Sequence, residues 1–220
     1  MKRSASFPHF DLKPICVLLM VTVVFSGCSL LPVASAIENG NGREQPDGTF
    51  DYDDFSDNTS GWDRLETDLG GTDYMDGSYH IFIDEKHTDY FSTLYRTYEN
   101  ITLQVDAKRV EGPVDNNYGL ICRFQDEKNF YAGMISSDGY YGLLKIENGQ
   151  YTVIGHDAMI FSDSLTSPDG SYTLRLDCYQ DFLFLYVNEN LMDVQQDDTF
   201  QSGDIVLIAG SFEDTGVNIQ

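Results

Sequence analysis

Basic residues are scarce in this sequence, and their scarcity restricts the partners that it can bind. Only 13 Lys and Arg residues stand against 36 Asp and Glu, so the formal net charge is −23. A surface this acidic repels the phosphates of nucleic acids and anionic membrane surfaces. We therefore expect no nucleic-acid partner, and we expect any attachment to a membrane to come from a covalent lipid.

Motifs for several kinds of catalysis are missing as well. His80, His87 and His156 show no metal-ligand spacing such as H-x-x-x-H, so no zinc site is indicated. The sequence contains no Gly-x-Ser-x-Gly around a nucleophilic serine and no glycine-rich phosphate loop. It thus presents no catalytic residue, and it favours a role other than catalysis.

The N-terminus carries the features of an export signal. Basic residues precede an apolar run at residues 15–25 (ICVLLMVTVVF), which is too short to span a bilayer. The FSGC sequence at residues 25–28 resembles the lipobox of bacterial lipoproteins, in which the cysteine is lipidated and becomes the new N-terminus. Cleavage after Ala36, behind an Ala-x-Ala sequence, is the alternative. We expect a signal peptide over residues 1–27 and a lipid on Cys28.

The remainder divides into a tether and one domain. Residues 28–48 contain Gly and Pro without hydrophobic periodicity, which predicts a flexible tether from the lipid. Residues 49–220 are enough for a single domain with one core. We expect the protein to be anchored by its lipid to the bacterial cell envelope, outside the cytoplasm. The sequence does not indicate an oligomeric state.

Strand patterns dominate the domain. Short apolar or alternating runs are separated by turn sequences such as Asp-Gly and Asn-Gly, which favours an antiparallel sandwich or barrel. The runs are residues 80–83, 101–110, 118–124, 129–135, 140–146, 151–154, 172–179, 182–188 and 204–212.

Alternation of apolar and polar residues assigns faces to these strands. In residues 120–124 and 172–178, the even-numbered side chains are predicted to face the core. Cys122 and Cys178 then face inward, whereas Arg123 faces outward. Because an exported protein meets an oxidising environment, we expect Cys122 and Cys178 to form a disulfide.

Several of these stretches resemble concanavalin A-like jelly-roll domains. They are DDFSD (53–57) with GW (61–62), YGLICR (118–123), NFY (129–131), SSDGYYG (136–142) and GDIVL (203–207). Together they are similar to a bacterial branch that includes laminin G-like modules and the 3-keto-disaccharide hydrolase domain, related in fold to family 16 glycoside hydrolases. The resemblance implies an all-β, antiparallel two-sheet jelly-roll sandwich. Such domains usually end in a Phe-Asp-Asn-Phe-like strand; residues 217–220 stop short of it, so we expect the last strand to be missing.

The relationship to glycoside hydrolases raises the question of catalysis. Family 16 enzymes carry Glu-x-Asp-x-(x)-Glu on one strand, so that alternation places the carboxylates on one face. The one Glu-x-Asp here is Glu66-Thr67-Asp68, which lacks the third acid and lies in a glycine-rich stretch that we expect to be a loop. A sugar-active hydrolase, similar to the 3-keto-disaccharide hydrolases, is therefore the alternative and not the first hypothesis.

An acidic stretch near residue 50 is a candidate calcium site. Calcium takes six to eight oxygen ligands, often from the carboxylates of one loop. Asp51, Asp53 and Asp54 supply such groups, although the central Gly of an EF-hand is absent. A solvated acidic edge is the simpler interpretation. No other cofactor is indicated.

A carbohydrate-binding patch is the main functional hypothesis. Aromatic faces stack on sugar rings, while Arg, Asn and Asp bind hydroxyl groups. In residues 141–146 alternation predicts that Leu144 and Ile146 face inward, and that Tyr141 and Lys145 face outward. The candidate ligand-binding residues are Arg123, Asn129, Tyr131, Asp138 and Tyr141. The expected ligand is a glycan or another envelope component, and a purely structural adhesion module is the further alternative.

Overall fold

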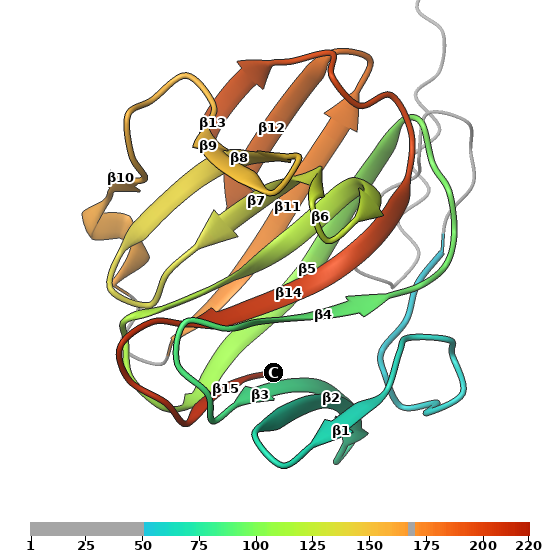
Figure 1. The fold of residues 1–220 in the computed structure, drawn as a ribbon, viewed down its shortest axis with the longest axis vertical. Coiled ribbons are helices and arrows are strands. Elements are labelled where there is room, and N and C mark those ends of the chain that lie inside the picture. The colour runs from blue at the N-terminus through green and yellow to red at the C-terminus, as the bar shows by residue number, and fades with distance from the viewer. Residues whose placement is uncertain (1–50, 167–169) are drawn as a thin grey trace, which may run out of the picture. The chain divides into compact units, whose positions relative to one another are not determined.

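The computed structural model describes residues 51–166 and 170–220, which form two antiparallel β-sheets. The order in the eight-stranded sheet is β1–β2–β3–β15–β5–β11–β12–β13. The order in the seven-stranded sheet is β10–β8–β7–β6–β14–β4, with β9 paired to β8. In Figure 1, β14 and β6 of the second sheet cross in front of β5 of the first. The prediction of an all-β, two-sheet jelly roll is confirmed.

The strand bounds follow the turn sequences closely. The eight-stranded sheet contains β1 (Leu65–Thr67), β2 (Gly70–Met75), β3 (Ser78–Ile83), β5 (Ile101–Glu111), β11 (Ser171–Tyr179), β12 (Phe182–Val187), β13 (Asn190–Gln196) and β15 (Val217–Ile219). The seven-stranded sheet contains β4 (Asp89–Thr93), β6 (Asn116–Asp126), β7 (Asn129–Ile135), β8 (Tyr140–Glu147), β9 (Gln150–Val153), β10 (Ile160–Phe161) and β14 (Asp204–Ser211). Among these residues the one helical element is a 3₁₀ turn at Asp163–Leu165.

The main core lies between the sheets, and a disulfide crosses it. Inward side chains such as Leu174 and Leu176 of β11 are at most 1 % exposed. Cys122 of β6 and Cys178 of β11 are bonded to each other, with their Cα atoms 6.7 Å apart. The predicted disulfide is confirmed, and it joins the two sheets covalently.

A second apolar cluster lies on the other side of the seven-stranded sheet. Its buried members are Ile121, Phe130, Ala132, Met134, Leu144, Val206 and Ile208. The prediction that Leu144 and Ile146 face the main core is wrong, because they belong to or pack on this outward cluster. Leu143 and Tyr141 face the main core instead. Both faces of β8 carry apolar residues, so alternation does not reveal which face is inward.

Several predictions concern residues outside the described ranges. The signal peptide, the lipid on Cys28 and the tether over residues 28–48 lie outside residues 51–166 and 170–220. Within those residues, no helix is both long enough and apolar enough to cross a membrane. At the other end, Val217–Ile219 form β15, which pairs with both β3 and β5. A further closing strand stays a prediction.

Candidate ligand-binding site

Arg123 lies inside the protein, contrary to the prediction that it faces outward. Its side chain is 1 % exposed, and its backbone φ is +53°. The register between β6 and β7 shifts after Cys122, so β6 contains a β-bulge here. A bulge inserts one extra residue into the strand, so the side chains that follow it lie on the opposite face from the one that strict alternation predicts. Gly203 fits this distortion, since a Cβ atom there would collide with the Arg123 backbone.

The Arg123 guanidinium holds three separate segments together. It donates to the carbonyl oxygens of Phe200 at 2.8 Å, Glu99 at 3.3 Å and Gln180. Burial lowers the pKa of Arg123, while nearby Tyr131 and Asp181 act in the opposite direction. Hydrogen bonds to three carbonyls offset the cost of burying the cation. Arg123 therefore fixes a surface loop from beneath, at Phe200.

Tyr131 binds the same loop, residues 197–203. The ring is fully buried, its hydroxyl donates to Asp197, and the backbone N–H of Phe200 donates back to the hydroxyl at 3.1 Å. Burial, with a further contribution from Asp197, raises the pKa of Tyr131 to about 12. Lys145 Nζ donates to Asp197 at 2.7 Å and to Thr199 at 3.0 Å. The 197–203 loop is thus tied to β6, β7 and β8.

Asp197 is the centre of this network. Burial alone would raise its pKa, but hydrogen bonds from Lys145, Thr199 and Tyr131 hold the pKa well below its ordinary value. The carboxylate is consequently ionised over the physiological range and remains available to all three donors. Together, Arg123, Tyr131 and Asp197 keep the 197–203 loop in one conformation.

A shallow pocket of about 400 Å³ opens between this loop and the end of β6 and β7. The residues that line it are Gln125, Asn129, Thr199, Phe200, Gln201 and Ser202. Asn129 is the one predicted site residue that lines it. The Phe200 ring packs edge-on against Tyr131, with centroids 5.1 Å apart, which fixes its orientation. The pocket therefore combines amide and hydroxyl groups with one fixed aromatic ring.

Two predicted residues lie elsewhere. Asp138 follows β7 at its far end and accepts a hydrogen bond from Ser136. The seven residues of β7 separate it from Asn129 by roughly 20 Å. Tyr141 faces the main core and is half-buried, so its predicted outward orientation is wrong. The five residues do not share one surface.

Sequence reasoning missed the residues of the 197–203 loop. Asp197, Thr199, Gln201 and Ser202 lie in a polar stretch between two strands, where the sequence shows only a turn. These residues matter because the buried side chains of Arg123 and Tyr131 hold their loop in place. Arg123 and Tyr131 are far from the loop in the sequence, so no local pattern reveals the contact.

The three acidic calcium candidates have partners within the protein. Asp51 pairs with Arg96 at 3.0 Å. Asp53 accepts the indole N–H of Trp62 at 3.0 Å, and Asp54 caps a turn. Within the part of the chain that the structure describes, no group of three or more acidic, His or Cys side chains is arranged to hold a metal. Calcium binding stays a prediction.

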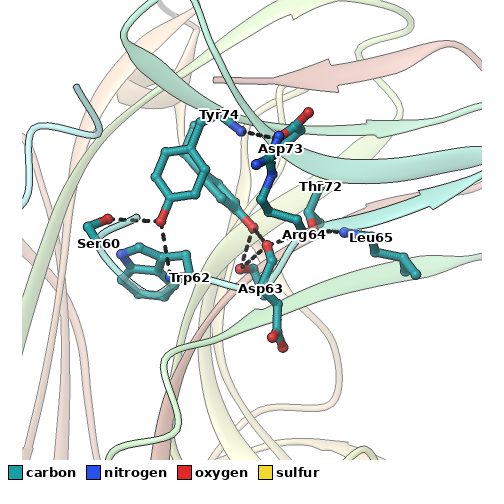
Figure 2. A network of polar contacts seen from close by, with 10 residues as sticks. Ser60, Trp62, Asp63, Arg64, Leu65, Thr72, Asp73 and Tyr74 are labelled. Atoms are coloured by element: carbon teal, nitrogen blue, oxygen red, sulfur yellow. Dashed lines mark hydrogen bonds and ion pairs between the residues drawn. The ribbon is translucent and has the colours of Figure 1, made fainter. Parts of the chain in front are cut away.

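Residues 60–65 are fixed to β2 and β3 by a network of hydrogen bonds (Figure 2). Tyr74 Oη lies 2.8 Å from Ser60 Oγ and accepts from the Trp62 backbone N–H at 3.0 Å. Thr72 donates to the Asp63 carbonyl at 3.1 Å. Arg64 forms an ion pair with Asp73. Trp62 packs against the main core.

Carboxylates are scarce on the face of the seven-stranded sheet that points away from the main core, where side chains of neighbouring strands lie side by side in rows across the sheet. The register places Asp89 beside Gly210 and Asn117, and burial raises the pKa of Asp89 while Asn117 lowers it. The neighbouring rows carry apolar side chains or glycine, as at Phe91 and Gly119. These rows hold no second carboxylate to pair with Asp89 as glycosidases require.

The Glu-x-Asp sequence gives no such pair either. Glu66 lies in the short strand β1, so the expectation that this whole stretch is a loop is wrong. Asp68 lies in the following turn, and both residues are exposed.

Comparison with known proteins identifies the fold. No family model matches the sequence, and no curated protein matches it. The carbohydrate-binding module CBM66 from Bacillus subtilis has a similar structure, with 19% identity, a TM-score of 0.58, and coverage of 74% of this chain and 92% of that one. The β-glucanase of Bacillus licheniformis gives 13% identity, a TM-score of 0.52, and coverage of 83% and 95%.

A third similar structure is a prokaryotic β-1,3-1,4-glucanase (lichenase) derived from a mouse hindgut metagenome. It has 10% identity and a TM-score of 0.53, and the match covers 76% of this chain and 93% of that one. At such identities the likeness concerns the fold alone. The similar structures and the strand order described above together show that this chain has the concanavalin A-like jelly-roll fold.

Proposed function

We propose that this protein is a lipid-anchored module outside the cytoplasm that binds a glycan or another component of the cell envelope. The pocket beside the 197–203 loop is the observation that carries this proposal. Its volume, about 400 Å³, lies in the usual range of small-ligand sites. The carbohydrate-binding module and the two glucanases with the same fold, described above, add support.

The chemistry of the pocket suits saccharide hydroxyl groups. A hydroxyl both donates and accepts hydrogen bonds, and Gln and Asn amides offer both functions side by side. Gln125, Asn129, Gln201 and Phe200 line the pocket. The three amides also donate within the protein, to the Ser202 carbonyl, the Asp126 carboxylate and the Asp198 carbonyl, and a sugar hydroxyl would use their remaining hydrogen-bonding capacity. The lining contains no charged side chain, so a neutral sugar fits better than a strongly charged ligand.

Binding is favoured over hydrolysis by the distribution of carboxylates. A retaining glycosidase needs two carboxyl groups about 5 Å apart. Neither this pocket nor the outward rows described above supplies such a pair among the described residues.

The disulfide supports the proposed location. Bonds such as Cys122–Cys178 persist in oxidising compartments and are rare in the cytoplasm. Replacing Cys28 by Ala should release the protein from membranes or leave the precursor uncleaved. Unchanged retention in the membrane, with cleavage after Ala36, would contradict lipid anchoring.

A glycan array and a glycosidase screen of residues 49–220 test the function. We expect a neutral glycan to bind without being cleaved, and Gln201→Ala to weaken binding by about 1 kcal/mol with unchanged thermal stability. Asp138→Ala is the matched control, because that residue lies at the other end of β7. Equal losses in both variants, or no effect of Gln201→Ala, would place the site elsewhere. No bound glycan at all would favour a structural module.

A further inference from the structure

A groove of about 840 Å³ opens between the two sheets and is larger than the pocket at the 197–203 loop. Apolar side chains of both sheets line this inter-sheet groove. They include Ile81, Leu103, Val105 and Ile219 of the eight-stranded sheet and Leu120 and Leu207 of the seven-stranded sheet. All six belong to the main core or pack against it. The groove therefore gives a ligand access to the apolar space between the sheets, and its volume is that of a small-ligand site.

One buried hydroxyl in the inter-sheet groove is unpaired. Tyr118 of β6 lines the groove and is 1 % exposed, and its Oη forms no hydrogen bond among the described residues. Burial raises the pKa of Tyr118, and Ser137, which lies nearby without bonding to it, lowers that pKa to a smaller extent. The phenol is thus neutral and able to donate. Because buried polar groups normally have a partner, an unpaired phenol in a groove of this size indicates a polar atom of a ligand.

The exposed rim of the groove, formed by residues 51–62 and Arg96, carries an excess of acidic groups. Five aspartates line the groove against one basic residue, Arg96, which pairs with Asp51 at 3.0 Å. Hydrogen bonds from the side chain and backbone two residues further along hold the pKa of Asp54 and of Asp57 below its ordinary value. Both carboxylates are therefore ionised at neutral pH, and the rim attracts cations.

Three aromatic rings stand beside these carboxylates. Phe55, Trp62 and Tyr79 line the groove and contact one another, with ring centroids 5.6 to 6.3 Å apart. Asp53 positions two of them, because it accepts the Phe55 backbone N–H at 2.8 Å and the Trp62 indole N–H at 3.0 Å. The Trp62 backbone is held in turn by Tyr74 (Figure 2). Aromatic rings next to carboxylates suit an ammonium group, and above all a quaternary one.

We propose that the inter-sheet groove binds a small cationic amphiphile, with its ammonium group at the rim and its apolar body among the core side chains. A polar atom of that body would pair with the Tyr118 hydroxyl. The acidic rim repels anions, and the apolar interior offers little to the hydroxyl groups of a sugar. This ligand class differs from the neutral glycan of the 197–203 pocket, so the inference does not depend on the proposed function.

Synthetic amphiphiles, each used below its micelle concentration, test the groove. Decyltrimethylammonium carries both parts of the ligand, decyl sulfate reverses the charge, decyl maltoside has a neutral sugar head, and tetramethylammonium lacks the chain. In titrations followed by amide chemical shifts, we expect decyltrimethylammonium to bind at least about tenfold more tightly than the other three. It should shift the amides of Leu103, Leu120 and Leu207 and leave those of β12 and β13 in place.

Matched variants separate the rim from the overall charge. Asp54→Asn with Asp57→Asn removes two charges and keeps side chains that stabilise the same turns. We expect this pair to weaken binding of decyltrimethylammonium about tenfold. Glu127→Gln with Glu189→Gln changes the net charge equally outside the groove and should have less than a twofold effect. Leu103→Trp should narrow the interior and abolish the shift at Leu120, with Tm changed by only a few degrees.

The Tyr118 hydroxyl is tested with a probe that carries a hydroxyl at the far end of its decyl chain. In the parent protein this hydroxyl should not weaken binding, whereas in Tyr118→Phe it should weaken binding about tenfold, because its partner is gone. The same loss in both proteins would exclude Tyr118 from the site.

Three results would overturn the proposal as a whole. Equal affinities for decyltrimethylammonium and decyl sulfate would show that charge plays no part. Equal losses in the two paired charge variants would show that the probe responds to net charge and not to the rim. Tighter binding of decyl maltoside than of the cation would assign the groove to a glycan.

Discussion

The two sheets differ in the chemistry of their outward faces. On β5 and β11 of the eight-stranded sheet, the outward positions are mainly polar and include Gln104, Thr173 and Arg175. On β6 and β7 of the seven-stranded sheet they are apolar and include Ile121 and Phe130. The first sheet therefore has one apolar face, and the second has an apolar cluster on each face. Alternation identifies the core only where the opposite face is polar.

Removing the bond that joins the two sheets should have the largest effect. Replacing both Cys122 and Cys178 by Ala releases a loop closed over a sequence separation of 56 residues. The chain-entropy estimate for such a loop is about 4 kcal/mol of unfolding free energy. Denaturant unfolding of the double variant and of the parent protein measures this loss. If the parent protein contains two free thiols under non-reducing conditions, the bond and the prediction both fail.

The outward cluster offers a direct test of the comparison. Phe130 is 3 % exposed and contacts Phe91 and Phe124, with ring centroids 5.9 and 5.7 Å apart. Phe130→Ala should therefore cost about 3 kcal/mol of unfolding free energy, as in an ordinary core. Thr173→Ala, on the outward face of the other sheet, should cost no more than about 0.5 kcal/mol. Similar costs for the two variants would show that the outward cluster is not a second core.

The sequence was sufficient for the fold class and the disulfide. Turn sequences and alternation located nine of the fifteen described strands and missed β1, β2, β4, β10, β13 and β15. On β11 they assigned the faces correctly. They failed on β8, where both faces are apolar, and at Arg123, where a bulge breaks the alternation. A bulge depends on tertiary contacts, here the close approach of Gly203, which no local pattern reveals. The candidate site was predicted only in part for the same reason.

Arg123 connects the edges of the two sheets, since its three acceptors precede β5, follow β11 and lie in the 197–203 loop. Arg123→Met keeps the apolar part of the side chain and leaves three backbone carbonyls without this donor. We expect a loss of about 2 kcal/mol in unfolding free energy. Amide exchange in the 197–203 loop should rise more than exchange in β11. A uniform rise throughout the protein would contradict a specific role in holding the loop.

Tyr131 provides the smallest and most selective test, because one hydroxyl joins β7 to the 197–203 loop. Tyr131→Phe removes the bonds to Asp197 and Phe200, and we expect a cost of about 1 kcal/mol at neutral pH. The pKa of Tyr131 is raised from 10.0 to about 12, so the folded state favours the neutral phenol. The stability that this group contributes is therefore fully present below pH 10 and is lost as the pH rises towards 12. The difference in unfolding free energy between the parent protein and Tyr131→Phe should accordingly be constant up to pH 10 and shrink above it. If that difference stays constant between pH 10 and 11, Tyr131 does not titrate as a buried donor, and the attachment of the loop depends on Arg123 and Lys145 instead.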